Sequence, residues 1–506
     1  MCKLGCQTLY LSTVVQKLSI YDTYTGKLLP FVAGQPSRVG FYLCGPTVYG
    51  DPHLGHGRHG VNFDVMIRYL RHLGYDVCYV RNITDVGHLT HDGDDKVIKK
   101  AQVEGIAPME IAQRYTNRYQ DAMRKLNNLR PNIEPLATGH IPEQIALVAT
   151  LLEKGWAYEV NGSVYFDLHA YQTKKEYGQL SGRKVSGLKS ETRPLATLTE
   201  KRHPHDFALW KKAQPNHAMR WSSPWSEGYP GWHLECTAMS KKYLGETFDI
   251  HGGGLDLCFP HHECEIAQAV SSTGKIPARY WVHNNLVLIN KKKMSKSANN
   301  FITLEDCFGG THPLLSQAYD PMVVRFFILQ AHYRSTLNFS DEALKAAKKG
   351  YLKLMNALHL LDHITIEGPS PSQAGETYAQ TIQHHCQSCY HAMNHDFNTA
   401  KVIAALMTLR KVITQVHTGH IDPKQINPTC WKKLKKTYTT FLVDLLGLQP
   451  PRLPQTKQLL TSLLKSYAAA KANQQEDQVE AIRKDLKAQG ITLQDQNSRV
   501  NWSYET

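Results

Sequence analysis

The chain has 506 residues, 42% of them apolar, which is enough for two to four packed domains. Its formal net charge of +14 favours a polyanionic partner such as a nucleic acid. The 11 cysteines are scattered along the chain, so we do not expect a disulfide framework. No apolar window reaches about 18 residues, so we do not expect a membrane-spanning helix. The expected location is therefore the cytoplasm.

The first predicted elements form a β-α-β unit. The apolar run Val39–Cys44 predicts a strand, and Gly45-Pro46 ends it. Apolar residues recur with helical spacing over 61–73, and residues 77–80 are again typical of a strand. Because a helix that joins two strands in this way requires them to run parallel, the predicted fold class is α/β with a Rossmann-like parallel sheet.

The α/β fold is predicted to be split by an insertion. Residues 105–140 have a helical pattern, whereas 155–225 are mixed, with weak periodicity. Strand patterns return at 247–250, before three glycines, and at 286–289, before a lysine cluster. The sequence therefore predicts an α/β domain in two halves around a connective domain.

The C-terminal third is predicted to be almost wholly helical. Two segments rich in Pro, Gly and polar residues, 367–376 and 449–457, interrupt the pattern and are interpreted as linkers. Residues 401–506 contain 16 Lys and Arg against 8 Asp and Glu. This excess of positive charge suits contact with phosphates.

The tetrapeptide His53-Leu54-Gly55-His56 follows the first strand and precedes a helix. Phosphates bind well at such a helix start because its backbone N–H groups lack intrahelical partners. Gly55 allows close approach of a nucleotide, and His53 and His56 can donate hydrogen bonds to phosphate oxygens. Four residues of this kind also occur by chance as ordinary turn histidines.

A second motif, Lys293-Met294-Ser295-Lys296-Ser297, follows the last predicted strand of the catalytic region. A lysine loop can clamp a triphosphate and oppose the charge that develops on departing pyrophosphate. Lysines alone would suggest a solvated surface. Together with the histidine motif, however, the pentapeptide resembles the signature pair of class I aminoacyl-tRNA synthetases.

A metal site is suggested by the segment His261-His262-Glu263-Cys264-Glu265. His261 and Glu265 are four residues apart, so on a helix they lie on one face. Cys44 and Cys236 could complete a tetrahedral zinc site. Spacing alone leaves three rival ligands open, which are His262, Cys258 and Cys264.

The longer motifs resemble one family within that class. They are CGPTVY (44–49), GWHLECTAM (231–239), DIHGGG (249–254), FPHHECEIAQ (259–268) and KMSKS (293–297). Together they resemble cysteinyl-tRNA synthetases from about residue 17 to the end of the chain. The resemblance implies activation of L-cysteine with ATP and Mg²⁺ to cysteinyl-adenylate and pyrophosphate, followed by transfer of cysteine to the 3′ end of tRNA(Cys).

The resemblance also assigns roles to residues. It implies one Zn²⁺ that binds the substrate thiolate and is held by Cys44, Cys236, His261 and Glu265. It implies that Thr84, Trp232 and His251 line the amino-acid pocket. It implies that ATP is bound by His53, Gly55, His56, Lys293, Ser295, Lys296 and Ser297. Of these residues, it implies a catalytic role for His53, His56, Lys293 and Lys296.

The expected domains follow from these motifs. They are an N-terminal extension (1–16), the first catalytic half (17–150), a connective insertion (151–225), the second catalytic half with the lysine loop (226–310), a helical stem-contact region (311–380) and a helical anticodon-binding region (381–506). We expect a monomer with tRNA, ATP and cysteine as partners.

The sequence argues against two alternatives, because it contains the features that each would lack. A cysteine ligase of thiol biosynthesis would share the catalytic half but lack the anticodon portion, and a non-catalytic relative would have lost the histidine or lysine motif. The pair Cys386 and Cys389 has C-x-x-C spacing, but no second pair follows it, so ordinary helix positions are expected.

Overall fold

The structure is a computed structural model that describes residues 17–89, 95–183, 200–215, 217–295, 298–366, 373–451, 457–496 and 499–505. The chain divides into two compact units. The first contains Met1–Asp306, Tyr333–Asn338 and Asn394–Phe397, and the second contains the remaining segments. Within the ranges given, no helix has both the length and the apolar character needed to cross a membrane.

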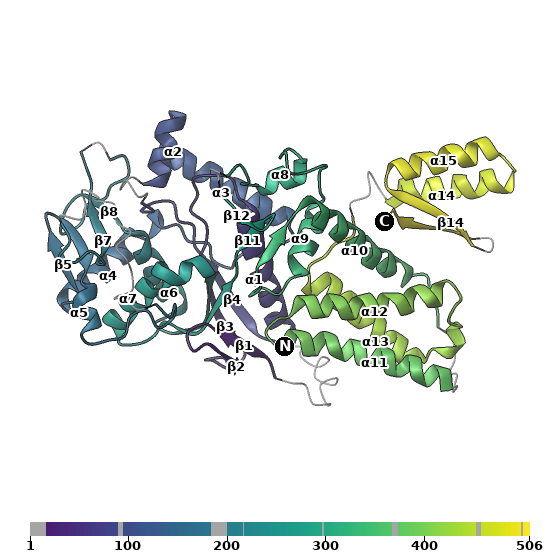
Figure 1. Ribbon diagram of the computed structural model, residues 1–506, viewed down its shortest axis with the longest axis horizontal. Coiled ribbons are helices and arrows are strands. Elements are labelled where there is room, and N and C mark those ends of the chain that lie inside the picture. The colour runs from purple at the N-terminus through teal and green to yellow at the C-terminus, as the bar shows by residue number, and fades with distance from the viewer. Residues whose placement is uncertain are drawn as a thin grey trace, which may run out of the picture. The chain divides into compact units, whose positions relative to one another are not determined.

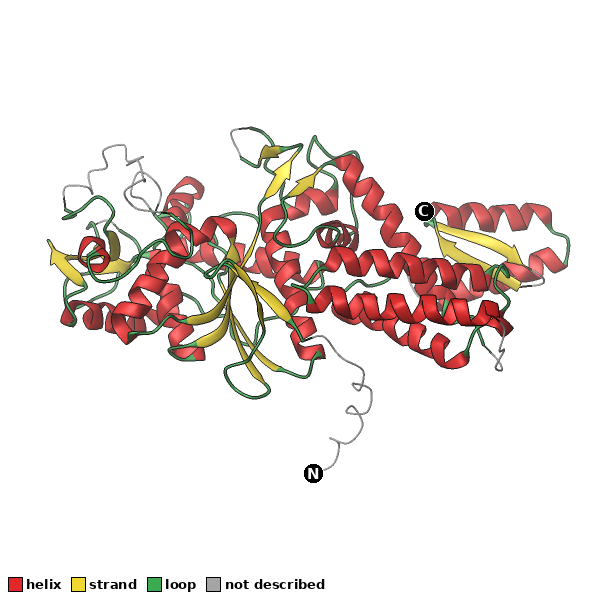
Figure 2. Ribbon diagram, turned by 60° about the horizontal axis from the view of Figure 1, so that its bottom comes forward, coloured by secondary structure: helices red, strands yellow, loops and turns green. Residues whose placement is uncertain are grey.

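A four-stranded parallel sheet with the order β10-β9-β3-β4 forms the centre of the first unit, and Figure 2 shows its strands as a twisted fan. The strands are β3 (Arg38–Leu43), β4 (Asp76–Arg81), β9 (Phe248–Gly254) and β10 (Ala278–Asn284). This arrangement confirms the α/β prediction. All four carboxyl ends lie at one edge, where open α/β sheets bind their ligands.

Successive residues of β3 face opposite sides of the sheet, and one helix covers each side. Phe41 packs edge-on against Phe63 of α1 (Leu54–His72), with ring centroids 6.0 Å apart. The next residue, Tyr42, belongs to a core cluster with Cys236 and Met239 of α6 (Trp232–Leu244). The sheet is therefore buried on both faces, as parallel sheets require.

The last strand of this sheet differs from the sequence interpretation. The predicted strand at 286–289 exists as β11 (Val287–Ile289), but it pairs antiparallel with β12 (Lys292–Lys293) in a separate sheet ordered β12-β11-β13. The parallel position is taken by β10, which carries the polar residues His283 and Asn284 in buried positions.

The insertion is a small antiparallel domain. Its sheet has the order β5-β6-β7-β8 and shares a core with α4, in which Leu147, Val148 and Leu151 pack with Trp210. The elements are α4 (Ile141–Glu153), β5 (Ala157–Val160), β6 (Ser163–Phe166), α5 (Leu168–Gln172), β7 (Phe207–Lys212) and β8 (Gly228–Pro230).

The other elements that lie wholly or mostly in the first unit surround the sheet. They are β1 (Ser19–Asp22), β2 (Lys27–Pro30), α2 (Lys96–Glu104), α3 (Pro108–Lys125), α7 (Glu263–Thr273) and β13 (Leu337–Phe339). The helical expectation for 105–140 holds for α3 and fails for most of 126–140, which forms a loop.

The second unit is mainly helical, and Figure 1 shows its long helices α11, α12 and α13 side by side. Its helices are α9 (Pro321–Leu329), α10 (Asp341–Leu360), α11 (Gln373–Asn394), α12 (Thr399–His417), α13 (Pro428–Thr439), α14 (Lys457–Ala472) and α15 (Glu476–Ala488). The short α8 (Leu304–Gly309) spans the boundary between the two units along the chain.

The chain ends in a β-hairpin where the sequence interpretation expected helix. Gly490 has φ +73° after α15 and redirects the backbone, and β14 (Ile491–Gln496) pairs antiparallel with β15 (Arg499–Tyr504). Ile491 packs with Leu460 and Tyr467 in a separate core. Ile491 and Leu493, the apolar residues of β14, are two positions apart, which is strand spacing.

Candidate active site

A cavity of about 570 Å³ opens at the carboxyl edge of the parallel sheet. Cys44 directly follows β3, Thr84 follows β4, and Asn284 ends β10, and all three line the cavity. The two sequence motifs also reach it through His53, His56 and Lys293. The structure therefore brings the two sequence motifs and the predicted cysteine ligands together around one cavity.

Four predicted metal ligands meet at the base of this cavity. The ligand atoms of Cys44, Cys236, His261 and Glu265 all lie within 4.8 Å of one another, and all four residues are buried. The two sulfurs are 3.8 Å apart, and Cys44 Sγ is 3.7 Å from Glu265 Oε1. Two thiols, an imidazole and a carboxylate are a donor set that suits tetrahedral zinc.

The local fold explains why these side chains converge. His261 lies two residues before α7 and Glu265 lies in the first turn of that helix, so that His261 Nε2 comes within 3.1 Å of Glu265 Oε1. Cys236 lies in the second turn of α6, on the side that packs against β3, where Cys44 follows the strand. The site therefore depends on three segments that are distant in the sequence.

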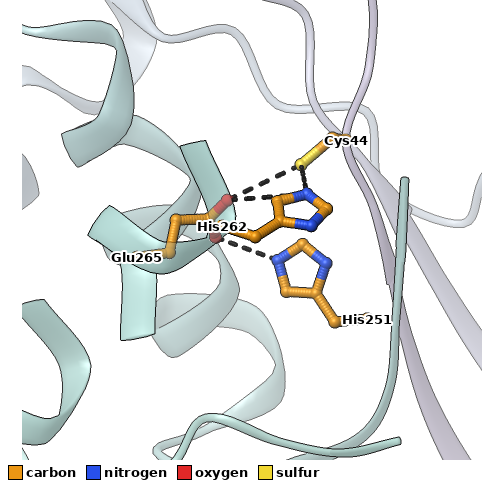
Figure 3. A group of neighbouring side chains, drawn as sticks. All are labelled: Cys44, His251, His262 and Glu265. Atoms are coloured by element: carbon orange, nitrogen blue, oxygen red, sulfur yellow. Dashed lines mark hydrogen bonds and ion pairs between the residues drawn. The ribbon is translucent and has the colours of Figure 1, made fainter. Parts of the chain in front are cut away.

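A second set of potential ligands overlaps the first. Cys44, His251, His262 and Glu265 also have ligand atoms within 4.8 Å of one another (Figure 3). His262 Nε2 is 3.3 Å from Cys44 Sγ, and its Nδ1 is 2.8 Å from His283 Nε2.

The cavity distinguishes the two sets. Cys44, Cys236 and His261 line it, whereas His251 and His262 are not among its lining residues. A metal held by the first set would thus lie beside the space that a substrate can enter. This argument supports the predicted set and leaves His262 as a hydrogen-bonding neighbour of Cys44.

The protonation states follow from burial and mutual contact. Burial raises the pKa of the Cys44 thiol to about 12. Burial alone would raise the pKa of Glu265, but His251 and His261 lower it to about 2. Burial would lower the pKa of His261, yet Cys236 and Glu265 raise it to about 10. Without a metal the group thus holds protons that a metal would displace.

His251 lies outside the cavity lining, in contrast to the expected place in the amino-acid pocket. Its side chain is fully buried, its Nε2 is 2.9 Å from Glu265 Oε2, and its ring stacks on Trp281 with centroids 4.4 Å apart. Its geometry suits orientation of the Glu265 carboxylate, a supporting contact that metal ligands commonly receive.

Thr84 and Trp232, the other two residues predicted to contact the amino acid, line the cavity. The ring of Trp232 contacts two imidazoles, with its centroid 4.1 Å from that of His88 and 4.3 Å from that of His261. Thr84 donates a short hydrogen bond to Glu235.

Glu235 is a cavity-lining residue that the sequence interpretation missed. It is 1% exposed, its Oε2 has no hydrogen-bond partner among the described residues, and burial raises its carboxyl pKa well above the usual value. The sequence feature that could have identified it is a glutamate inside the otherwise largely apolar helix segment WHLECTAM. His88 and Lys96 also line the cavity, and their side-chain nitrogens are 2.6 Å apart.

The histidine motif forms a reciprocal cap at the start of α1. His53 Nδ1 accepts from the backbone N–H of Gly55 at 3.0 Å, and His56 Nδ1 accepts from that of His53 at 3.1 Å. In each neutral ring the proton therefore lies on Nε2, which makes Nε2 the donor. A Cβ at Gly55 would come within 2.8 Å of the His53 ring and would displace the capping imidazole.

Burial holds the pKa of His56 well below its usual value, with His53 and His59 as further causes. His56 is thus neutral near pH 7 and can still donate from Nε2. Its neutral state is compatible with a role as hydrogen-bond donor to a phosphate.

The lysine loop is held at its base by Asn300. This buried side chain accepts from Ser295 N at 2.8 Å and donates to Lys293 O at 3.1 Å. Lys293 and Met294 line the cavity. The predicted residues Lys296 and Ser297 lie outside the described residues.

Comparisons with known proteins agree with the family resemblance of the sequence motifs. The family described as tRNA synthetases class I (C) catalytic domain matches residues 30–349, and the DALR domain matches 389–448. Among curated relatives, the chain is 51% identical to Cysteine--tRNA ligase of Bacteroides thetaiotaomicron over 96% of this chain and 99% of that protein. It is 43% identical to the protein of the same name from Chlorobaculum tepidum, over 97% and 99%.

Solved structures share the fold at low sequence identity. Methionyl-tRNA synthetase of Mycobacterium tuberculosis with methionyl-adenylate matches with a TM-score of 0.57 at 14% identity, over 81% of this chain and 92% of that chain. LeuRS of Agrobacterium radiobacter, in a ternary complex, matches with a TM-score of 0.57 at 11% identity, over 85% of each chain.

Proposed function

The chain belongs to the cysteine–tRNA ligases, a family of class I aminoacyl-tRNA synthetases, and from this premise we propose how its residues carry out the reaction. Its activity is ATP-dependent joining of cysteine to tRNA. The observation that carries the residue assignment is that the thiols, the histidine motif and Lys293 line one cavity.

Recognition of cysteine is assigned to the base of the cavity. We propose that Cys44, Cys236, His261 and Glu265 hold one Zn²⁺, because their donor atoms cluster and three of the residues face the cavity. Bound there, zinc would supply a position that prefers a thiolate to a hydroxyl, which favours cysteine over serine. Tenfold discrimination requires only about 1.4 kcal/mol.

Thr84 and Trp232 are proposed to contact the rest of the amino acid, since both line the cavity beside the sulfur ligands. His251 is proposed to act on the substrate indirectly, by orienting Glu265. The protein residues would thus hold the substrate carboxylate ready to react with ATP.

Activation of cysteine is assigned to the two nucleotide motifs. The substrate carboxylate attacks the α-phosphorus of ATP with Mg²⁺, the bond to the β-phosphate oxygen breaks, and pyrophosphate leaves with cysteinyl-adenylate retained. His53 and His56 are proposed to donate from Nε2 to the α-phosphate, Gly55 to admit it, and Lys293, Ser295, Lys296 and Ser297 to bind the departing phosphates.

The second step places cysteine on the nucleic acid. A hydroxyl of the terminal ribose of tRNA(Cys) attacks the adenylate carbonyl, the ester forms, and AMP leaves. We propose that 311–380 contact the tRNA stem and that 381–506 bind the anticodon, which the match to a DALR domain at 389–448 supports. A monomer in the cytoplasm is part of the same proposal.

The direct test is a charging assay with purified protein, ATP, total tRNA and either cysteine or serine. We expect cysteine-dependent pyrophosphate exchange and charging of tRNA with cysteine only. For the metal, cobalt substituted for zinc should show stronger thiolate-to-cobalt bands on addition of cysteine but not of serine. Activation of cysteine without any spectral change would mean that the metal does not contact the substrate.

A further inference from the structure

A short turn between α11 and α12 has unusual backbone geometry. Asp396 and Phe397 have φ values of +62° and +52°, the left-handed region that favours glycine. Both residues are buried, at 1% and 2% exposure. A bulky residue persists in this conformation only where the surrounding contacts determine it, and such strain is often found at functional positions.

The carboxylate of Asp396 is the centre of these contacts. Oδ1 accepts from the backbone N–H of Tyr21 at 2.9 Å and from the hydroxyl of Tyr333 at 2.6 Å. Oδ2 accepts from Nε of Arg334 at 2.6 Å. The guanidinium of Arg334 also lies over the ring of Tyr21, 4.1 Å from its centroid. The turn thus fixes one end of the segment Tyr333–Asn338.

That segment supports the hairpin of β11 and β12, which carries Lys293 of the lysine loop. Hydrogen bonds that join the two include those from Asn285 N to Tyr333 O at 2.9 Å, Asn285 Nδ2 to Arg334 O at 2.8 Å, Leu337 N to Leu286 O at 3.1 Å and Lys291 N to Asn338 Oδ1 at 2.6 Å. Asn285 and Leu286 themselves line the cavity, as does Lys293. A shift of the segment would therefore move one wall of the nucleotide site.

The helix that carries the histidine motif rests on the same segment. Arg58, two residues after His56, is buried, and its Nη2 donates to Tyr333 O at 3.1 Å and to Ser335 O. Farther along α1, the hydroxyl of Tyr69 donates to Asn394 Oδ1 at 2.7 Å. Both nucleotide motifs thus depend on backbone that Asp396 holds in place.

We propose that Asp396 is a positioning residue for ATP, acting through Arg334 and Tyr333 on the wall of the nucleotide site. The inference rests on the proposed function, since it concerns the ATP of the same reaction. None of these contacts reaches the sulfur ligands at the base of the cavity. Loss of the Asp396–Arg334 pair should therefore weaken ATP use and leave cysteine recognition unchanged.

The test compares Arg334→Gln, Asp396→Asn and the double variant by cysteine-dependent pyrophosphate exchange. The side chain of Arg334 is 40% exposed, so its replacement spares the core. Each single variant should raise KM for ATP by about fivefold or more while KM for cysteine stays within about twofold. The double variant should be no worse than the worse single variant, since both remove one interaction.

Arg220→Gln is the matched control, because Arg220 is also 40% exposed and pairs with Glu227 at 3.2 Å. It should change neither KM. An unaltered KM for ATP in Arg334→Gln, or equal rises of both KM values, overturns the inference, and that result stands even if Asp396→Asn fails to fold. Absence of exchange in the unaltered protein would instead reject the proposed function.

Discussion

At Glu265 the two carboxylate oxygens serve different partners. Oε1 faces His261 and Cys44, whereas Oε2 faces His251. One side chain thus joins the potential metal ligands to a supporting imidazole. The neighbouring residue Cys264 is equally buried but points to Tyr177, whose hydroxyl is 3.6 Å from its sulfur. Adjacent residues on one helix therefore have unrelated roles.

This difference gives a paired test of the metal site. Cys236→Ser replaces a thiolate ligand by a hydroxyl that zinc binds poorly, so the purified variant should retain well under one equivalent of zinc and bind cysteine weakly. Cys264→Ser, at a position with 2% exposure against 1% for Cys236, should retain about one equivalent. Metal analysis of both proteins measures this, and equal zinc contents would remove Cys236 from the ligand set.

The raised pKa values at the site predict a proton exchange. Near pH 7 the metal-free group is protonated on Cys44, with a pKa of about 12, and on His261, with a pKa of about 10. Burial also raises the pKa of Cys236 well above its usual value. Coordination requires thiolates and a neutral imidazole, so binding of one metal ion should release about three protons.

The direction in which metal affinity changes with pH follows from mass action. Protons are products of metal binding, so lower pH should weaken metal affinity and higher pH should strengthen it. Titration of zinc into metal-free protein in weak buffer, with a pH indicator, measures the released protons. Release of less than about one proton per metal would contradict the assigned protonation states.

At the scale of elements, the start of α1 combines a structural and a chemical task in one residue. His53 caps the helix through Nδ1 and faces the cavity. His53→Asn keeps a good capping acceptor and removes the ring donor. The free energy of unfolding should change by less than about 0.5 kcal/mol, whereas His53→Ala should cost about 1 kcal/mol.

Both His53 variants should slow pyrophosphate exchange by about a hundredfold, because each lacks a donor to the charge that develops on the phosphate. Urea unfolding and exchange kinetics separate the two effects. If His53→Asn exchanged normally, the histidine would be only a cap.

The elements also show where sequence analysis succeeds and fails. The β-α-β unit over 39–80 was predictable because its strands are apolar runs. β10 was missed because it carries buried polar residues, and His283 Nδ1 and Asn284 Oδ1 contact Thr23 and His59 at 2.9 Å. Such partners become visible only in three dimensions. Residue spacing likewise left His261 and His262 as rivals; the family resemblance favoured His261, and the cavity lining supports that choice.

At the scale of the whole molecule, the C-terminal part has a core of its own. Leu460, Tyr467, Ile482, Leu486 and Ile491 form a separate hydrophobic cluster. All groups assigned to ATP, cysteine and the metal belong to the first unit. A chain that ends at residue 451 therefore keeps every residue assigned to activation of the amino acid.

We expect this truncated chain to exchange pyrophosphate at close to the full rate and to charge tRNA poorly, with a higher KM for tRNA. The physical reason is that the truncation removes basic residues, which can bind phosphates, and the hairpin of β14 and β15 with Trp502, which can stack on unpaired bases. Parallel exchange and charging assays of both chains provide the measurement. Full charging by the shorter chain would show that residues 452–506 are dispensable for tRNA.

The separation of Cys44 from Glu265 by 221 residues also affects the newborn protein. At about 5–20 residues per second, a ribosome needs roughly 10–45 s to pass from one codon to the other. During that interval the Cys44 thiol has no complete ligand set around it and is open to oxidants or to the wrong metal. Until the chain has been synthesised past α7, the finished site therefore cannot shield that thiol.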